Sequence, residues 1–260
     1  MKKINIALFQ CSAIQRSMAQ VYRDLENAFK KASKMKVDLI VTPELYLSGY
    51  SNSKIIKKIA QSKNSKILKN ISELAKKFKI GLVLGYPEKV SNKIYNSAIV
   101  FDDKGNEIFN YRKLSLPNDF EKNCFSIGNK IDVFKFKGIK CSILICYDVE
   151  FPELTRKAAQ LGTELIIVPT ALRKKWRIVS EKIIPTRAYE NSLYLAYCDY
   201  ANGKLNSTFS GGSTVCAPDG NKLTIETSKT NLIYANINTK NIVAKRKEFN
   251  FLHKSLKNNY

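Results

Sequence analysis

The chain has 260 residues, with 44 Lys and Arg against 22 Asp and Glu, which gives a formal net charge of +22. This length allows one large domain or two small ones with an ample core. No stretch reaches the roughly 18 apolar residues of a membrane span, and the first apolar run is too short for a signal peptide. We therefore expect a cytoplasmic protein without a membrane partner.

Residues that form disulfides or bind metals are sparse. Six cysteines are scattered without CxxC spacing, which favours reduced thiols over a disulfide framework. The single histidine, His253, would have to serve any Ser-His-Asp triad, Cys-His dyad or multi-His metal site. A nucleophilic cysteine would therefore take a carboxylate as its base, and we expect no metal or organic cofactor.

A strongly basic chain is a candidate for nucleic-acid binding. Here the lysines are spread over the whole sequence, and the densest basic patch, 173–177, is short and has no accompanying RNA- or DNA-binding motif. We expect solvated surface lysines and no specific nucleic-acid partner. A basic nucleic-acid-binding protein remains a remote alternative, which binding to DNA at moderate salt would favour.

Patterns typical of strands and helices alternate along the chain. The strands are expected at 4–9, 38–42, 80–86, 95–101, 107–111, 141–145, 163–168, 193–198, 212–216 and 222–227. Two helices place apolar residues on one face, namely Val21, Leu25, Ala28, Phe29 and Ala32, and then Ile67, Leu68, Ile71, Leu74, Ala75 and Phe78. A third helix is expected between residues 176 and 191. Without repeats or linkers, this pattern predicts one α/β domain, 1–260, in which 240–260 form a basic C-terminal tail.

The most informative stretch is 143–153. A buried strand ends there at Cys146, acidic residues follow at once, and a helical pattern begins beyond Pro152. Cys146 therefore lies on a strand-to-helix turn, where backbone N–H groups can lower a thiol pKa or hold an oxyanion. A cysteine at the end of a buried strand can equally be a small core residue, so this pattern alone leaves both readings open.

Three further reactive side chains follow predicted strands. Glu44 comes just past 38–42, Lys113 just past 107–111, and Glu121 in the loop after Lys113. Each of them alone is ordinarily a solvated side chain. Together with Cys146 they make a Glu–Lys–Cys set, which can perform nucleophilic catalysis on an acyl group.

These motifs resemble those of the nitrilase superfamily of carbon–nitrogen hydrolases. The matching segments occur in the family's order, at 43–45, 111–113, 145–148 with 151–153, 187–191, and 211–215 with 218–220. The resemblance implies a four-layer αββα sandwich that pairs into a homodimer or a higher homo-oligomer. It also implies that Cys146 is the nucleophile, Glu44 the general base, Lys113 the oxyanion-stabilising cation and Glu121 a second active-site glutamate, with Asp119 as a weaker rival for Glu121.

A mechanism follows from these roles. A free thiol is only a few per cent thiolate at about pH 7, so Glu44 would take the thiol proton during attack. Lys113 and the backbone N–H of Tyr147 would stabilise the tetrahedral oxyanion. Glu44 would then protonate the leaving amine, and a water activated by Glu44 with help from Glu121 would hydrolyse the thioester.

The residues after Cys146 favour an amidase. Cys-Tyr-Asp resembles the amidase branches, and ω-amidase-like members carry Arg where this chain has Glu150. We therefore expect a thiol amidohydrolase that converts a small aliphatic amide, neutral or amine-bearing, to a carboxylic acid and ammonia. Tyr147, Glu150 and Trp176 are expected to contact the substrate, although Glu150 and Trp176 have equally good structural roles. An N-carbamoyl amine or amino-acid amidohydrolase, which also releases CO2, and a catalytically inactive interaction protein remain alternatives.

Overall fold

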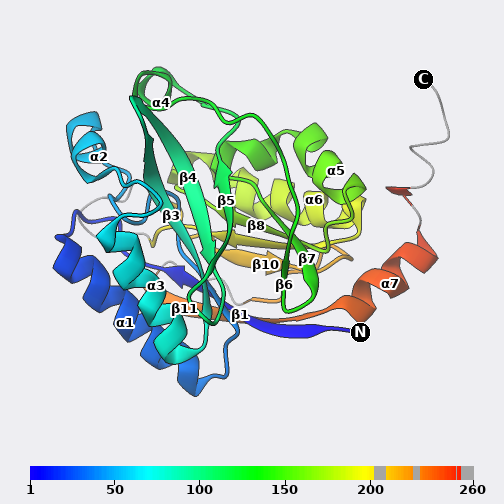
Figure 1. The fold of residues 1–260 in the computed structure, drawn as a ribbon. Coiled ribbons are helices and arrows are strands. Elements are labelled where there is room, and N and C mark those ends of the chain that lie inside the picture. The colour runs from blue at the N-terminus through cyan, green and yellow to red at the C-terminus, as the bar shows by residue number, and fades with distance from the viewer. Residues whose placement is uncertain (202–208, 225–228, 250, 253–260) are drawn as a thin grey trace.

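Two β-sheets stack face to face in the middle of the molecule, and helices cover their outer faces (Figure 1). The computed structural model describes residues 1–201, 209–224, 229–249 and 251–252. Within these residues the chain is the α/β, four-layer αββα sandwich that the sequence predicts.

Each sheet has a parallel centre with antiparallel neighbours. The first has the order β11-β1-β2-β3-β4-β5, and only β1, β2 and β3 run parallel. Its strands are β1 (Lys3–Gln10), β2 (Leu39–Val41), β3 (Gly81–Val90), β4 (Lys93–Phe101), β5 (Glu107–Arg112) and β11 (Asn231–Asn238). The second has the order β10-β9-β8-β7-β6, with β7, β8 and β9 parallel. Its strands are β6 (Phe134–Phe136), β7 (Ile139–Ile143), β8 (Leu165–Pro169), β9 (Tyr194–Cys198) and β10 (Thr214–Cys216).

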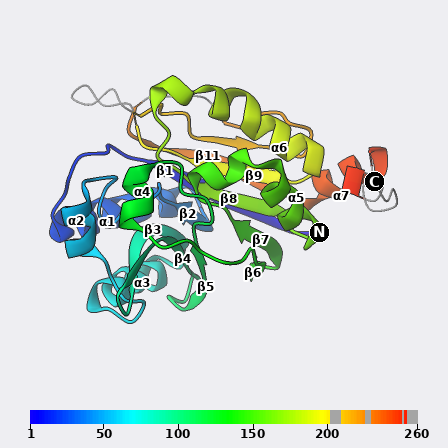
Figure 2. The ribbon, with the colours of Figure 1, turned by 90° about the horizontal axis from the view of Figure 1, so that it is seen from above.

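The helices lie on opposite sides of this pair of sheets. They are α1 (Met18–Lys34), α2 (Ser53–Ile59), α3 (Lys66–Phe78), α4 (Asp119–Cys124), α5 (Pro152–Gln160), α6 (Ile184–Asn191) and α7 (Thr239–Glu248). Helices α1 and α3 pack on the six-stranded sheet, and α5 and α6 pack on the five-stranded sheet. Figure 2 shows α6 and α3 on opposite sides of the molecule. None of the described helices is long and apolar enough to cross a membrane.

Side chains that point alternately to the two faces of the strands form the two main hydrophobic cores, one between the sheets and one between the six-stranded sheet and its helices. In β1, Ile6 and Leu8 face the five-stranded sheet, whereas Ala7 and Phe9 face α1 and α3. Side chains of a strand point alternately to its two faces, so a strand that is apolar at every position supplies both layers. This is why the central strands read as continuous apolar runs rather than as alternating ones.

The long predicted elements are confirmed. Helices α1 and α3 bury the apolar faces that their sequences predict, and β4 and β5 pair as the expected hairpin. The short elements α2, α4 and β6 had no predicted counterpart, and neither did β11. Of the predicted strand 222–227, Lys222 forms a single bridge with Cys216, and 225–227 lie outside the described residues.

The third predicted helix is confirmed as a continuous helical run over 178–191, which follows a short 3₁₀-helix at Lys174–Trp176. Its first part is π-helical, Val179–Ile183, and α6 continues it from Ile184. Pro185 lies in the first turn of α6. Proline has no backbone N–H to donate to the preceding turn, so the regular hydrogen-bond pattern is interrupted at this position while the helical backbone continues.

Part of the predicted C-terminal tail is a helix. Residues 240–248 belong to α7, and Ile242 of this helix is buried in the core between the sheets. The helix carries few apolar residues among its lysines, which is why its sequence resembles a basic tail. His253 and the rest of 253–260 lie outside the described residues.

Docking of α7 through Ile242 leads to a stability prediction. Ile242→Ala should lower the free energy of unfolding by about 2–5 kcal/mol because it leaves a cavity in the core. Val243→Ala is the matched control, because Val243 is exposed on the same helix. Thermal or denaturant unfolding measures both variants, and equal small effects would show that α7 does not pack on the core.

Candidate active site

The turn that carries Cys146 has a constrained backbone. Strand β7 ends at Ile143, and a 3₁₀-helix begins at Cys146, leading into α5. Cys146 has a φ of 48°, in the left-handed region that residues with a Cβ rarely adopt. Such strained residues persist where the surroundings fix them, and they are frequent at functional sites. Cys146 is partly exposed as a residue, unlike the other five cysteines, although its thiol group is buried.

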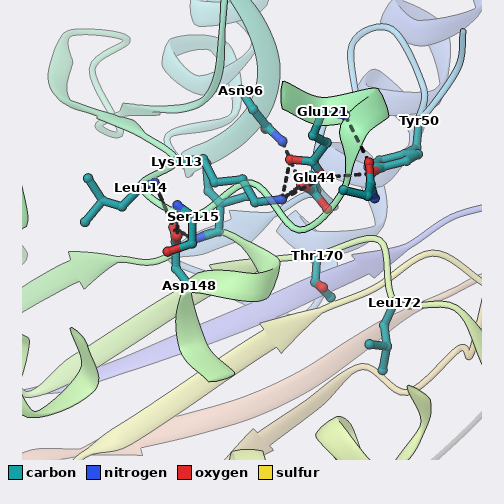
Figure 3. Close-up of polar contacts among 12 residues, drawn as sticks. Glu44, Tyr50, Asn96, Lys113, Leu114, Ser115, Glu121, Asp148, Thr170 and Leu172 are labelled. Atoms are coloured by element: carbon teal, nitrogen blue, oxygen red, sulfur yellow. Dashed lines mark hydrogen bonds and ion pairs between the residues drawn. The ribbon is translucent and has the colours of Figure 1, made fainter. Parts of the chain in front are cut away.

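Asp148 holds this turn in place from inside the fold. Its buried carboxylate accepts hydrogen bonds from the backbone N–H groups of Ile145 at 3.0 Å and Ser115 at 2.8 Å. It also accepts from the N–H of Leu114 (Figure 3). The hydroxyl of Tyr111 donates to the same carboxylate at 2.9 Å. The carboxylate thereby ties the Cys146 turn to the segment that directly follows Lys113.

Arg187 of α6 supports the same turn from the outside. Its guanidinium donates to the backbone carbonyls of Val149 at 3.2 Å and Glu150 at 2.8 Å, and it pairs with Glu190. These contacts use the last residues of the 3₁₀-helix that starts at Cys146. The segment 187–191 therefore contributes to the framework around Cys146.

Lys113 lies at the centre of a buried charge cluster (Figure 3). Its Nζ is 2.7 Å from Oε1 of Glu44 and 2.8 Å from Oε2 of Glu121. All three side chains are almost completely inaccessible to solvent. Burial alone would lower the pKa of Lys113, but the two carboxylates keep that pKa well above its usual value. Burial raises the pKa of Glu121 in spite of its contact with Lys113.

The two oxygens of Glu44 have different environments. Oε1 accepts hydrogen bonds from Lys113 and from Nδ2 of Asn96, both at 2.7 Å. Within the described residues, Oε2 is buried and has no hydrogen-bond partner. An unpaired buried oxygen is unfavourable unless a bound molecule or a reacting group completes it. Glu44 Oε2 is therefore available to accept a proton.

The thiol of Cys146 is neutral in the resting site. Burial raises its pKa well above the usual value, and the negative charge of Glu44 raises it further. Lys113 lowers this pKa in part, as do the polar groups of Thr170 and Ala171. A neutral thiol needs a base at the moment of attack, and Glu44 is the charged acceptor beside it.

Glycine at position 85 allows Glu44 to reach this place. A Cβ at Gly85 would lie 2.2 Å from the carbonyl oxygen of Pro43 and 2.8 Å from the backbone nitrogen of Leu45. The segment around Glu44 therefore crosses β3 in direct backbone contact. The Gly85 N–H donates to the Thr42 hydroxyl at 3.1 Å, which fixes the crossing.

Sequence reasoning missed two side chains of this site, Asn96 and Tyr50. The Tyr50 hydroxyl donates a hydrogen bond to Oε1 of Glu121 at 2.6 Å, and Nδ2 of Asn96 donates one to Oε1 of Glu44. Asn96 is a buried polar residue in the middle of an apolar strand, which is a pattern that the sequence does contain. Tyr50 lies in an irregular segment without such a pattern, and only the three-dimensional arrangement brings it to Glu121.

The other predicted site residues have varied positions. Asp119 is 94 % exposed, so Glu121 and not Asp119 joins the cluster. Tyr147 is half-buried, with its ring edge-on to Phe151 at 4.9 Å. Glu150 is half-buried, and its carboxylate interacts electrostatically with Lys113. Trp176 is 55 % exposed, and none of its described contacts is with Glu44, Lys113, Glu121 or Cys146.

Among the described residues, no group of three or more His, Cys, Asp or Glu is arranged to hold a metal ion.

Removal of the buried cation should make stability strongly dependent on pH. Lys113→Met leaves Glu44 and Glu121 buried without their counter-ion, which raises both folded-state pKa values above those of the unfolded chain. A raised folded pKa makes stability fall as pH rises, so the variant should lose about 3–5 kcal/mol near pH 8 and less near pH 5. Thermal unfolding from pH 5 to 8 tests this, with Lys122→Met, at an exposed lysine, as control. A pH-independent loss would contradict the charge argument.

Comparisons with known proteins agree with this geometry. The sequence model of the carbon–nitrogen hydrolase family matches residues 5–247. The hydrolase of the pqqF 5' region of Pseudomonas protegens is 34% identical over 227 residues, which cover 86% of this chain and 79% of the relative. An (R)-stereoselective amidase from Pseudomonas sp. is 32% identical over 188 residues, 72% of this chain and 68% of the relative. An amidase from Nesterenkonia sp. superposes with a TM-score of 0.85 at 30% identity, covering 97% of this chain and 96% of the other. The chain therefore belongs to the carbon–nitrogen hydrolase family of the nitrilase superfamily and is an amidase-type hydrolase of non-peptide carbon–nitrogen bonds.

Proposed function

We propose that this protein hydrolyses small aliphatic amides to carboxylic acids and ammonia through a thioester on Cys146. The observation that carries the proposal is the buried Oε2 of Glu44, which has no hydrogen-bond partner among the described residues. Lys113 and Asn96 hold the other oxygen of this carboxylate, and the carboxylate interacts electrostatically with the Cys146 thiol. A base, a nucleophile and a cation in one site are the components that acyl transfer requires.

In the first half of the reaction, Glu44 accepts the thiol proton while the Cys146 sulfur bonds to the amide carbon. The carbonyl oxygen becomes an oxyanion, which Lys113 and the backbone N–H of Tyr147 stabilise. The C–N bond then breaks, and the nitrogen takes the proton from Glu44 and leaves as ammonia. Each proton that Glu44 receives is thus returned to the leaving group.

In the second half, water replaces ammonia. The oxygen of this water bonds to the thioester carbon while Glu44 accepts one of the water's protons. Glu121 assists in orienting the water. The C–S bond breaks, the sulfur regains a proton, and the carboxylic acid leaves. Lys113 contacts Glu44 and Glu121 at once, so its positive charge holds the two carboxylates together in the buried site.

The charge of Glu150 supports neutral or cationic amides as substrates. Glu150 is half-buried, and within the described residues its carboxylate forms no hydrogen bond or ion pair. It interacts only at longer range with the positive charges of Lys113 and Arg187. Such a group repels a substrate carboxylate and attracts an amine. A variant of the Nesterenkonia amidase binds butyramide, a small neutral amide. An omega-amidase from Saccharomyces cerevisiae is also similar to this chain, at 31% identity over 260 residues, so the charge of the substrate has to be tested directly.

A panel of amides tests both the reaction and the role of Glu150. Ammonia release should occur with butyramide and with ω-amino amides, and it should vanish in Cys146→Ala. Glu150→Gln should raise KM for an ω-amino amide about tenfold, the value of one weak charge contact, while kcat/KM for butyramide changes little. Glu153→Gln is the matched control, because Glu153 is exposed on the neighbouring helix.

Three outcomes would contradict this proposal. A dicarboxylate monoamide as the best substrate by kcat/KM would overturn the proposed preference for neutral or cationic amides. Turnover of N-carbamoyl compounds alone, with release of CO2 and ammonia, would assign the same residues to a carbamoyl hydrolase. Ammonia release that persists in Cys146→Ala would remove Cys146 as the nucleophile.

A further inference from the structure

A further buried carboxylate, Glu88 of β3, takes no part in the cluster around Lys113. Its Oε2 accepts hydrogen bonds from the Ser97 hydroxyl at 2.8 Å and from Nδ2 of Asn110 at 3.0 Å. The Arg112 guanidinium donates Nε to Oε2 at 2.8 Å and Nη2 to Oε1 at 2.9 Å. Burial raises the pKa of Glu88, but the hydrogen bonds from these three donors outweigh burial and lower that pKa below its usual value. Glu88 is thus an ionised side chain in a bidentate ion pair.

This ion pair joins three strands of the six-stranded sheet. Glu88 lies on β3, Ser97 on β4 and Arg112 on β5, which is the edge strand, so the contact spans the whole width of β4. An edge strand has ladder hydrogen bonds to a neighbouring strand on one side only. The side chain of Glu88 therefore adds a cross-link to the end of β5 from the second strand away.

The opposite face of the same strand ends carries active-site residues. Ser97 directly follows Asn96, and Arg112 directly precedes Lys113, so in each pair the two side chains point to opposite faces of the sheet. Ser97 and Arg112 lie opposite each other in the β4–β5 register, and the N–H of Lys113 donates to the carbonyl of Asn96 at 2.8 Å. Asn96 and Lys113 both donate to Oε1 of Glu44 at 2.7 Å (Figure 3).

We propose that Glu88 is a positioning residue of the active site, which fixes Asn96 and Lys113 against Glu44 by clamping the ends of β4 and β5 from the other face of the sheet. It touches neither the substrate nor the reacting atoms, and it acts through the residues next to Asn96 and Lys113 in sequence. This role goes beyond the proposed function and rests on Lys113 being the cation that stabilises the oxyanion.

Two substitutions at this position separate the clamp from its charge. Glu88→Ala removes the four hydrogen bonds to the carboxylate. The Arg112 side chain that it leaves behind is 34 % exposed, so water can solvate its charge. Glu88→Gln keeps the length of the side chain and one oxygen that can accept from Ser97 and Asn110. The glutamine is therefore the conservative variant.

Steady-state kinetics on the best amide compares the two variants. Glu88→Ala should lower kcat about tenfold with a smaller change in KM, because a displaced Lys113 stabilises less of the charge that develops after the substrate has bound. Glu88→Gln should keep kcat within about threefold of the wild type. A wild-type kcat in Glu88→Ala, or an equal loss in both variants, would overturn the proposal.

Asp38→Ala is the matched control in the same sheet. Asp38 lies just before β2, at the end of that strand opposite to Glu44. Its partly buried carboxylate accepts from the backbone N–H of Asn5 at 2.8 Å and pairs with Lys137. This variant should keep the wild-type kcat. A tenfold loss here as well would show that any weakened ion pair in the sheet lowers kcat, which would overturn the positioning role.

A double-mutant cycle on denaturant unfolding gives a readout that needs no turnover. It compares Glu88→Ala, Lys113→Met and the double variant at about pH 6, where Lys113→Met retains more of its stability than at higher pH. The effects of independent sites on the unfolding equilibrium constant multiply. If Glu88 positions Lys113, the combined effect should be about fivefold or more smaller than the product, because the loss of the clamp already weakens the contacts that Lys113→Met removes.

A cycle that obeys the product within about twofold would overturn the positioning role. This result would stand even if no amide proves to be a substrate, an outcome that would count against the proposed function alone.

Should Glu88→Ala fail to fold, Arg112→Lys takes its place in both experiments. It keeps the positive charge opposite Glu88 and loses the two parallel N–H donors of the guanidinium. A several-fold loss of kcat is then expected, together with a combined effect with Lys113→Met that is smaller than the product. Either a wild-type kcat or a cycle that obeys the product would overturn the proposal.

Discussion

One buried lysine between two buried glutamates is the interaction on which the site depends. Charges in a protein interior lose their hydration, and attraction offsets that loss only if geometry and hydrogen bonding are good. Lys113 meets this condition by contacting both Glu44 and Glu121, and Asn96 and Tyr50 each donate a second hydrogen bond to a carboxylate oxygen that Lys113 also contacts. In the part of the chain that the structure describes, Oε2 of Glu44 is the carboxylate oxygen of this cluster without a partner. This oxygen is the one that remains available to accept the thiol proton.

The rest of the fold serves to bring this atom and Cys146 together. Glu44, Lys113 and Cys146 lie just beyond the ends of strands from both sheets, at one edge of the sandwich. The direct backbone contact at Gly85 allows the segment around Glu44 to lie close against β3. Asp148 then connects the Cys146 turn to the residues after Lys113. Two sheets with separate hydrogen-bond ladders are in this way coupled through side chains at the site itself.

The sequence predicts those parts of the site that local pattern controls. Glu44, Lys113 and Cys146 each follow a predicted strand, and their roles and that of Glu121 are what the resemblance to the nitrilase superfamily implies. Asn96 and Tyr50 reach the cluster across 52 and 71 residues of sequence, and no local pattern encodes such contacts. The same limit applies to α7, which is anchored by one buried apolar residue, Ile242, although its lysine-rich composition resembles a tail.

In the proposed mechanism, Glu44 removes the proton of a neutral Cys146 thiol to start acylation. Rapid quenching of the enzyme with a short amide, followed by intact-mass measurement, detects the acyl group on Cys146. We expect a transient acyl adduct in the wild type and none in Glu44→Gln, whose amide keeps the hydrogen bonding near Lys113 but cannot accept the proton. An adduct that forms at the wild-type rate in Glu44→Gln would contradict it.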